Sequence, residues 1–426
     1  MSNLNFGRLS DYTEQRRRIR EWALRLRQLR PSIKTTWTEP ADWVVKDANI
    51  HGQPVRSLTI TLTPTGCQWA STGGCTMCGE YEGSTKDEIV PAEFHIAQFA
   101  SAVSKYVSKY EPSWIRIYQE GNYANPQEIE GSAQSTILRL ASLIRGVRRI
   151  SIESMAKYLH KREIVQELSQ SVARGVELEI GIGFEGENDV VRNICINKGE
   201  SISDFRRAVA LLRDIGIRSL AYIVLKPPFL SEGEAVEEAI ATIRLANEIG
   251  FDAISLEPLS IHKYTLVHAL HLEGLYQLPW LWSVVKVAKS AQDIKDFRIG
   301  GVGFYPRPID VTNNRHPDGK DDCNERLWKA IKEYGKFRKL EVFSGIECAC
   351  QKEWETICQT SEIDLRKRID QQLDRLDIDR YKQSIMVDSE FQTPVVSFTT
   401  AVTLGTQYPV ARRDEKIDDA GKRYST

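Results

Sequence analysis

Residues 57–81 read SLTITLTPTGCQWASTGGCTMCGEY. The first part is rich in β-branched residues, which is typical of a strand, and the Thr-Gly pair at 65–66 ends it. Cys67, Cys75 and Cys78 follow at once with the spacing C-x7-C-x2-C. The stretch therefore predicts a strand whose carboxyl end opens into a loop carrying three thiols.

Helical and strand-like segments alternate beyond this loop with a period of about 35 residues. Such alternation indicates parallel strands joined by crossover helices. The strand-like runs cover residues 57–66, 114–119, 148–154, 176–185, 219–228 and 253–260. These are too few for a closed eight-stranded barrel, so we expect an α/β fold with a partial (β/α)6 barrel of the TIM type. In such a fold, functional residues gather at the carboxyl ends of the strands.

The regular alternation divides the chain into three predicted parts. Residues 1–50 form an N-terminal helical extension, and residues 51–290 form the partial barrel. Residues 291–426 form a mixed C-terminal extension with the remaining cysteines.

Composition excludes several classes of protein. The chain has 426 residues, of which 41% are hydrophobic and 27% charged, so wholesale disorder is excluded. The formal net charge of -1 gives no overall attraction to nucleic acid or to membranes, so such binding requires a local patch. We expect a cytoplasmic protein without a membrane span, whose cysteines are kept reduced and serve metal binding more than disulfides.

Residues 12–30, YTEQRRRIREWALRLRQLR, predict a helix with seven arginines between Arg16 and Arg30. One interpretation is a solvated face of a helix that covers a barrel end. The other is a patch that binds phosphate groups.

The chemistry of the three-cysteine loop has three interpretations. Thiolates select iron–sulfur clusters, zinc or copper(I), and a structural zinc site needs a fourth ligand that the nearby sequence lacks. Three thiolates suit a 4Fe–4S cluster with one iron open to bind a substrate. The alternatives are three ordinary buried thiols, or a zinc site that borrows a distant ligand.

The loop resembles that of the radical S-adenosylmethionine (radical SAM) superfamily, although the usual superfamily spacing is C-x3-C-x2-C. The wider gap is similar to a branch that contains the archaeosine synthase radical SAM subunit and, more distantly, the elongator radical SAM domain. Stretches resembling the archaeosine subunit follow in order at residues 66–81, 118–129, 181–199, 222–239 and 278–285. The resemblance covers roughly residues 35 to 360.

The resemblance implies an enzyme that binds a 4Fe–4S cluster on Cys67, Cys75 and Cys78 and cleaves S-adenosylmethionine to a 5′-deoxyadenosyl radical. It further implies a radical lyase that acts on lysine-modified 7-deazaguanine in tRNA. A partner protein would transfer the lysine, and a ferredoxin or flavodoxin would donate electrons. One alternative is a radical SAM enzyme for a small molecule, including one that transfers an aminocarboxypropyl group. Another is a non-catalytic metal-binding adaptor for RNA or protein.

Ten residues are implied to contact S-adenosylmethionine through its adenine, ribose, amino or carboxylate groups. They are Met77, Gly79, Tyr81, Glu120, Gly121, Asn122, Glu153, Ser154, Glu185 and Lys198. Most lie just beyond predicted strand ends, where ordinary strand-end carboxylates and helix caps also occur. Lys226 and Glu257, at the ends of the next two strands, are candidate substrate contacts.

The late cysteines offer a second candidate metal site. Cys323, Cys348, Cys350 and Cys358 could close a tetrahedral zinc site. An auxiliary iron–sulfur cluster, capture of a thiophilic substrate and unligated thiols are the alternatives. Cys195 stands alone in a helical segment, and we expect it to be structural.

Overall fold

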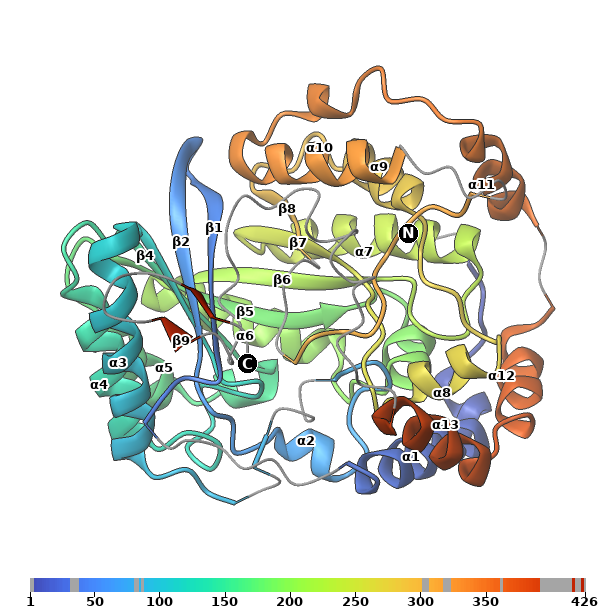
Figure 1. The fold of residues 1–426 in the computed structure, drawn as a ribbon, viewed down its shortest axis with the longest axis horizontal. Helices are drawn as coiled ribbons and strands as arrows, with labels where there is room; N and C mark the ends of the chain where they lie inside the picture. Colours follow the sequence, from blue (N-terminus) through green and yellow to red (C-terminus); the bar gives the residue numbers. More distant parts are fainter. Residues whose placement is uncertain are drawn as a thin grey trace.

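The computed structural model describes residues 4–30, 38–79, 84–85, 88–300, 306–316, 323–360, 363–390, 416–417 and 423–424. One curled sheet forms its centre, with the strands in chain order from β1 to β8 (Figure 1). The strands are β1 (Asp42–Ile50), β2 (Gln53–Thr61), β3 (Trp114–Tyr118), β4 (Arg149–Glu153), β5 (Glu177–Glu185), β6 (Arg218–Leu225), β7 (Ala253–Pro258) and β8 (Phe297–Ile299). Strands β2 to β8 are parallel, which confirms the predicted partial barrel.

The six predicted strands correspond to β2 to β7, and the sheet adds a strand at each edge. Strand β1 pairs antiparallel with β2 through a two-residue turn. Both turn residues, His51 and Gly52, have positive φ angles of 51° and 82°, as a tight hairpin requires. Because β1 lies before residue 51 and β8 after residue 290, the sheet runs past both predicted boundaries, and the division into three parts stays a prediction.

Helices on the outer side of the sheet bury its apolar face (Figure 1). They are α3 (Ala92–Tyr110), α4 (Gly131–Ser142), α5 (Arg162–Gln170), α6 (Ile202–Ile215), α7 (Glu232–Ile249), α9 (Leu281–Ser290) and α10 (Cys323–Phe337). Short helical turns lie at η3 (Ala156–Leu159), η4 (Val191–Cys195) and η5 (Leu340–Phe343), and η4 is a π-helix. Capping boxes begin α6 at Ser201 and α7 at Ser231.

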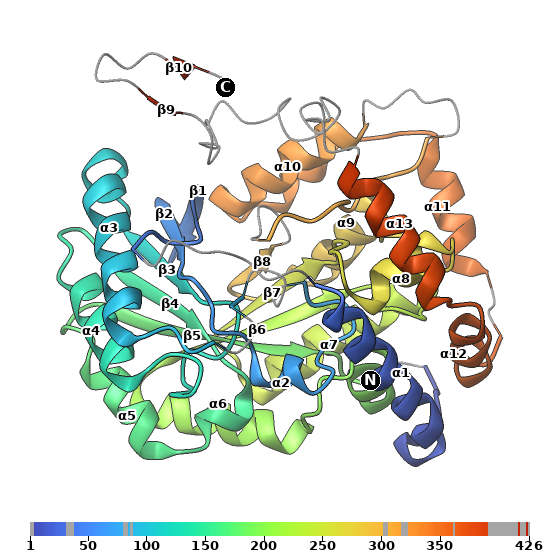
Figure 2. The same cartoon turned by 60° about the horizontal axis from the view of Figure 1, so that its bottom comes forward.

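A second apolar cluster joins helices from both ends of the chain (Figure 2). It includes η1 (Leu9–Tyr12), α1 (Thr13–Gln28), α8 (Leu266–Leu272), α12 (Leu365–Asp374) and α13 (Ile378–Glu390). Helix α1 contacts both α8 and α12. The remaining elements are α2 (Gln68–Ser71), α11 (Cys350–Gln359) and the paired short strands β9 (Lys416–Ile417) and β10 (Arg423–Tyr424).

Candidate functional site

The three-cysteine loop begins where β2 ends, and Cys67 is the N-cap residue of the short helix α2. In the part of the chain that the structure describes, the sulfurs of Cys67, Cys75 and Cys78 do not all lie within 4.8 Å of one another. A single zinc ion, with Zn–S bonds of about 2.3 Å, holds its sulfurs about 3.8 Å apart. The observed arrangement therefore does not suit one ion bound by all three thiolates.

The loop is tied to the segment that follows the π-helix η4. The Thr76 backbone N–H donates to the carbonyl of Ile196 at 2.9 Å, and its hydroxyl donates to the carbonyl of Cys195 at 2.7 Å. The Asn197 amide donates to the carbonyl of Gly74 at 2.8 Å. Asn197 is buried and has a φ of 57°, so a strained residue orients this contact. Cys195 itself is buried in the apolar core, as expected of a structural cysteine.

A second anchor is Glu128, which is 1% exposed and was not singled out from the sequence. Its carboxylate accepts hydrogen bonds from the backbone of Gln68 at 3.1 Å and from the side chains of Asn122 and Asn125 at 2.8 and 2.9 Å. Asn122 also places its amide nitrogen 3.6 Å from the sulfur of Cys67. Burial and the nearby charge of Glu128 raise the pKa of the Cys67 thiol to about 12. Glu128 thus holds the turn after β3 against the first cysteine.

Arg27 on α1 is a third anchor. Its guanidinium donates to the carbonyl of Cys75 at 2.7 Å. Gly74 leaves room for this contact, because a Cβ there would lie 2.7 Å from the Cα of Ala70 and 3.0 Å from the Arg27 guanidinium. A helix from the N-terminal part therefore braces the middle of the cysteine loop.

Most other arginines of α1 are also engaged within the chain. Arg17 pairs with two glutamates of α1, and Arg18 pairs with Asp370 and Asp374 on α12. Arg20 donates to the side chain of Asn197. Just beyond the end of the helix, the buried Arg30 donates to Ser84. These contacts favour the interpretation of a helix that covers the barrel end over that of a phosphate-binding patch.

Three predicted site residues have backbone conformations that non-glycine residues rarely adopt. Glu120, Glu185 and Lys226 have φ angles of 53°, 68° and 63°. They follow or end β3, β5 and β6, and all three are buried. Each such conformation costs on the order of 1–3 kcal/mol, and such strain concentrates at binding and catalytic sites.

The side chains of Lys198 and Glu185 meet inside the barrel mouth. Their Nζ and Oε1 atoms are 3.2 Å apart, and both residues are buried. Burial opposes the charge of Lys198, but Glu185 and the neighbouring Cys75 outweigh it and hold the Lys198 pKa above its ordinary value. Gly183 makes this pair possible, because a Cβ there would lie 2.2 Å from the Lys198 nitrogen.

Two buried polar side chains at the same strand ends lack hydrogen-bond partners in the described part of the chain. They are the amide of Gln119 and the hydroxyl of Ser154, which are 1% and 4% exposed as residues. Buried polar groups are normally paired, so these two are suited to a polar ligand. The resemblance drawn from the sequence pointed to Ser154 and to the strand end that begins with Gln119.

The other predicted cofactor residues lie around this mouth. Glu153 ends β4, and Gly121 and Asn122 form the turn after β3. Met77 and Gly79 are in the cysteine loop, whereas Tyr81 lies outside the described residues.

The two candidate substrate residues have partners within the chain. Lys226 pairs with Glu232 at 2.7 Å, and burial lowers its pKa although Glu232 opposes that effect. Glu257 accepts a hydrogen bond from Ser255 at 2.6 Å. Their role toward a substrate stays a prediction.

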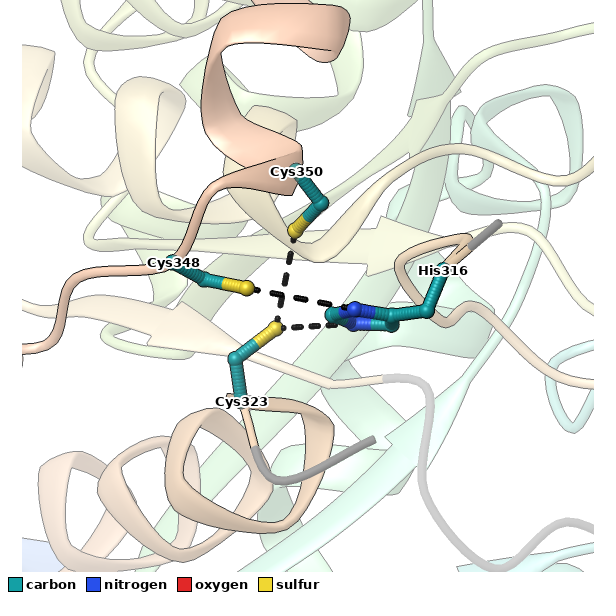
Figure 3. Close-up of side chains that lie close together, drawn as sticks. All are labelled: His316, Cys323, Cys348 and Cys350. Carbon is teal, nitrogen blue, oxygen red and sulfur yellow. Dashed lines mark hydrogen bonds between the residues drawn. The ribbon is translucent and has the colours of Figure 1, made fainter. Parts of the chain in front are cut away.

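Four side chains form a separate compact group: His316, Cys323, Cys348 and Cys350 (Figure 3). Their ligand atoms all lie within 4.8 Å of one another. Burial raises the pKa of the Cys323 and Cys350 thiols. This group could hold a metal ion.

The predicted fourth cysteine, Cys358, does not belong to the group found among the described residues. Cys350 and Cys358 lie eight residues apart on α11, which is about 12 Å along a helix. They therefore cannot bind one ion, and His316 takes the predicted place of Cys358. The sequence signal for it, a histidine seven residues before Cys323, was missed.

None of the described helices combines the length and apolar character needed to cross a bilayer.

Two relatives carry the name archaeosine synthase subunit beta. The one from Methanosarcina acetivorans is 28% identical over 341 residues, which are 80% of this chain and 95% of the relative. The one from Thermococcus kodakarensis is 29% identical over 324 residues, which are 76% of this chain and 97% of the relative. These matches confirm the predicted resemblance.

The similarity to solved structures is weaker than the similarity to these relatives. Elp3 from Methanocaldococcus infernus is 14% identical with a TM-score of 0.41, over 57% of this chain and 59% of that one. Methylornithine synthase (PylB) is 12% identical with a TM-score of 0.39, over 81% and 92%. At these values the likeness supports no inference about activity. No family model matches the chain.

Proposed function

We propose that this protein is a radical SAM enzyme and, within that superfamily, a radical lyase that acts on lysine-modified 7-deazaguanine in tRNA. The observation that carries the proposal is the C-x7-C-x2-C loop at the carboxyl end of the first parallel strand. This loop lies in a chain that aligns with 95% of the length of a relative named archaeosine synthase subunit beta, at 28% identity.

The residues at the barrel mouth fit the implied cofactors. Cys67, Cys75 and Cys78, in the loop after the first parallel strand, would hold a 4Fe–4S cluster with one iron left open. The unpaired amide of Gln119 and hydroxyl of Ser154 offer hydrogen bonds to a polar ligand such as S-adenosylmethionine. When bound, the cluster and S-adenosylmethionine supply one-electron cleavage and removal of a substrate hydrogen atom.

The chain itself supplies position and electrostatics. Glu128, Arg27 and Asn197 fix the cysteine loop from three sides. Lys198, which pairs with Glu185 in the structure, would exchange this partner for the carboxylate of the cofactor. The strained strand ends at Glu120 and Glu185 hold these carboxylates in fixed orientations.

The proposed reaction also needs partners. A ferredoxin or flavodoxin would supply the electron, and a second protein would attach lysine to the tRNA. Since most arginines of α1 are engaged within the chain, that second protein is also suited to present the tRNA. We further propose a cytoplasmic location for this reaction.

The test is anaerobic reconstitution of the purified protein with iron and sulfide, followed by mass spectrometry after incubation with S-adenosylmethionine and lysine-modified tRNA. The expected products are 5′-deoxyadenosine and tRNA carrying a formamidine. Formation of 5′-deoxyadenosine without a tRNA product would support the small-molecule alternative. Formation of 5′-methylthioadenosine would support aminocarboxypropyl transfer. If S-adenosylmethionine is not cleaved at all, the result would support the alternative of a non-catalytic metal-binding adaptor.

Arg27 gives a prediction specific to this chain. Replacing Arg27 by alanine removes a charge-assisted hydrogen bond to the Cys75 carbonyl, which contributes about 1.5–3 kcal/mol. We expect the cysteine loop to hold iron about 10- to 100-fold more weakly, measured as iron retained at increasing chelator concentration. Arg25, exposed on the same helix with its guanidinium 5.1 Å from the Trp22 ring, is the matched control. Equal iron loss in Arg25→Ala, or no iron loss in Arg27→Ala, would show that Arg27 does not stabilise the cysteine loop.

A further inference from the structure

We propose that His316, Cys323, Cys348 and Cys350 bind a single zinc ion in a closed, structural site. This site is separate from the cysteine loop of the proposed function and serves a different purpose. The segment that leads to it, residues 306–316, reaches the ends of the barrel strands.

The geometry of the group matches one tetrahedral ion. The sulfurs of Cys323 and Cys350 are 3.7 Å apart, close to the separation of about 3.8 Å expected for two thiolates on one zinc. The His316 ring lies 3.1 Å from the sulfur of Cys323 and 3.9 Å from that of Cys348. Figure 3 shows the three sulfurs and the ring converging on a common centre.

The donor set selects the kind of metal. Three thiolates and one imidazole are soft or borderline ligands, which favour zinc over magnesium or calcium. An auxiliary iron–sulfur cluster would spread its ligands farther apart than these four atoms lie. Because the protein supplies all four ligands, the site has no open position for a substrate and is structural.

Neighbouring groups support charged sulfurs at this place. The indole N–H of Trp282 donates to the sulfur of Cys350 at 3.2 Å. The amide of Asn314 donates to the sulfur of Cys323 at 3.3 Å, and its own backbone N–H donates to the side chain of Asn324 at 2.7 Å. Such outer contacts orient metal ligands and stabilise thiolate charge.

The proposed metal joins three structural elements that lie within residues 316–350. His316 ends the described segment 306–316, Cys323 begins α10, and Cys350 begins α11. Within the described residues, no strand or single helix joins these three places, so a shared ion would fix their relative positions.

The segment 306–316 connects the group to the barrel mouth. The Thr312 hydroxyl donates to the carbonyl of Leu259 at 3.1 Å, and Ile261 and Asp310 form an isolated β-bridge. The next residue, His262, packs against Gly79 so closely that a Cβ on Gly79 would lie 2.2 Å from the imidazole. The ion would thus fix the segment that backs the end of the cysteine loop.

The test is the metal content of the full chain, purified without oxygen and measured by mass spectrometry of zinc and iron. We expect about one zinc per chain, and at least about a ten-fold loss of zinc in His316→Ala and in Cys350→Ser. Cys358→Ser is the matched control, because Cys358 is a half-buried thiol on the same helix as Cys350 but outside the group. It should keep its zinc.

Two further measurements keep the test decisive. Wild-type protein produced with cobalt should show the intense visible bands of tetrahedral Co²⁺ with thiolate ligands, even if the variants fail to fold. A variant with all three loop cysteines replaced should lose iron but keep zinc, which separates this site from the proposed function. Wild-type protein with neither zinc nor tetrahedral cobalt bands would overturn the proposal, as would equal zinc loss in Cys358→Ser.

Discussion

Replacing Cys75 by alanine is expected to remove the iron of the cysteine loop and to reduce cleavage of S-adenosylmethionine to background. Two thiolates cannot replace three as ligands of a cluster that must keep one iron open. Cys75 is also the residue whose carbonyl Arg27 holds, so it lies at the centre of the anchored loop. The measurements are the visible absorbance of the reconstituted protein, its iron content and the formation of 5′-deoxyadenosine.

A cysteine outside both groups provides the control for this experiment. Cys358 lies on α11, and burial raises the pKa of its thiol to about 12, so it is a neutral thiol at neutral pH. Cys358→Ala should therefore keep the absorbance, the iron and the cofactor cleavage of the wild-type protein. Full activity in Cys75→Ala would contradict the proposed function, whatever the state of the second metal group.

The parallel part of the fold could be predicted because its signal is local. Strand β2 shows the reason: Leu58, Ile60 and Leu62 alternate with polar residues in and just after the strand, and all three are fully buried. Strand β1 was not predicted, because its sequence DWVVKDANI mixes charged and apolar residues at an edge of the sheet. Strand β8 has only three residues, which are too few to show a periodic pattern.

The parts of the candidate site that lie within one stretch of sequence could be predicted. Contacts between residues that are distant in sequence could not. The spacing of Cys67, Cys75 and Cys78 is visible in one loop, and polar residues follow each strand. Arg27, however, reaches Cys75 across 48 residues, and Asn197 reaches Gly74 across 123. Such contacts follow from tertiary packing, which no local pattern encodes.

The amino-terminal ends of the strands hold a charge network that the sequence did not indicate. Glu179 on β5 is fully buried, and Arg298 on β8 donates to both of its carboxylate oxygens at 2.8 and 2.7 Å. Arg149 and Arg218 lie 3.6 Å from the same carboxylate. Arg298 also lies over the ring of the buried Trp114. This bidentate pair links β5 to the edge strand β8 across the curled sheet, so we expect Glu179 to stabilise the open barrel more than any surface ion pair does.

Replacing Glu179 by glutamine is expected to lower the free energy of unfolding by about 3–5 kcal/mol. The three guanidinium groups of Arg149, Arg218 and Arg298 would then share only two carboxylates, Glu177 and Asp296, so one buried positive charge would be left uncompensated. Burial alone would raise the Glu179 pKa, but Arg298 and Arg149 outweigh it and hold the pKa well below its ordinary value. A lowered pKa stabilises the fold above the unfolded carboxyl pKa of about 4.3, and this contribution fades as the pH falls below it. The difference between variant and wild type in chemical denaturation should therefore be largest near neutral pH and shrink in acid. Glu248→Gln, in an exposed pair with Arg206, should change stability by less than about 1 kcal/mol. An equally small change in Glu179→Gln would mean that the arginines find other partners and that the network does not hold β8 in place.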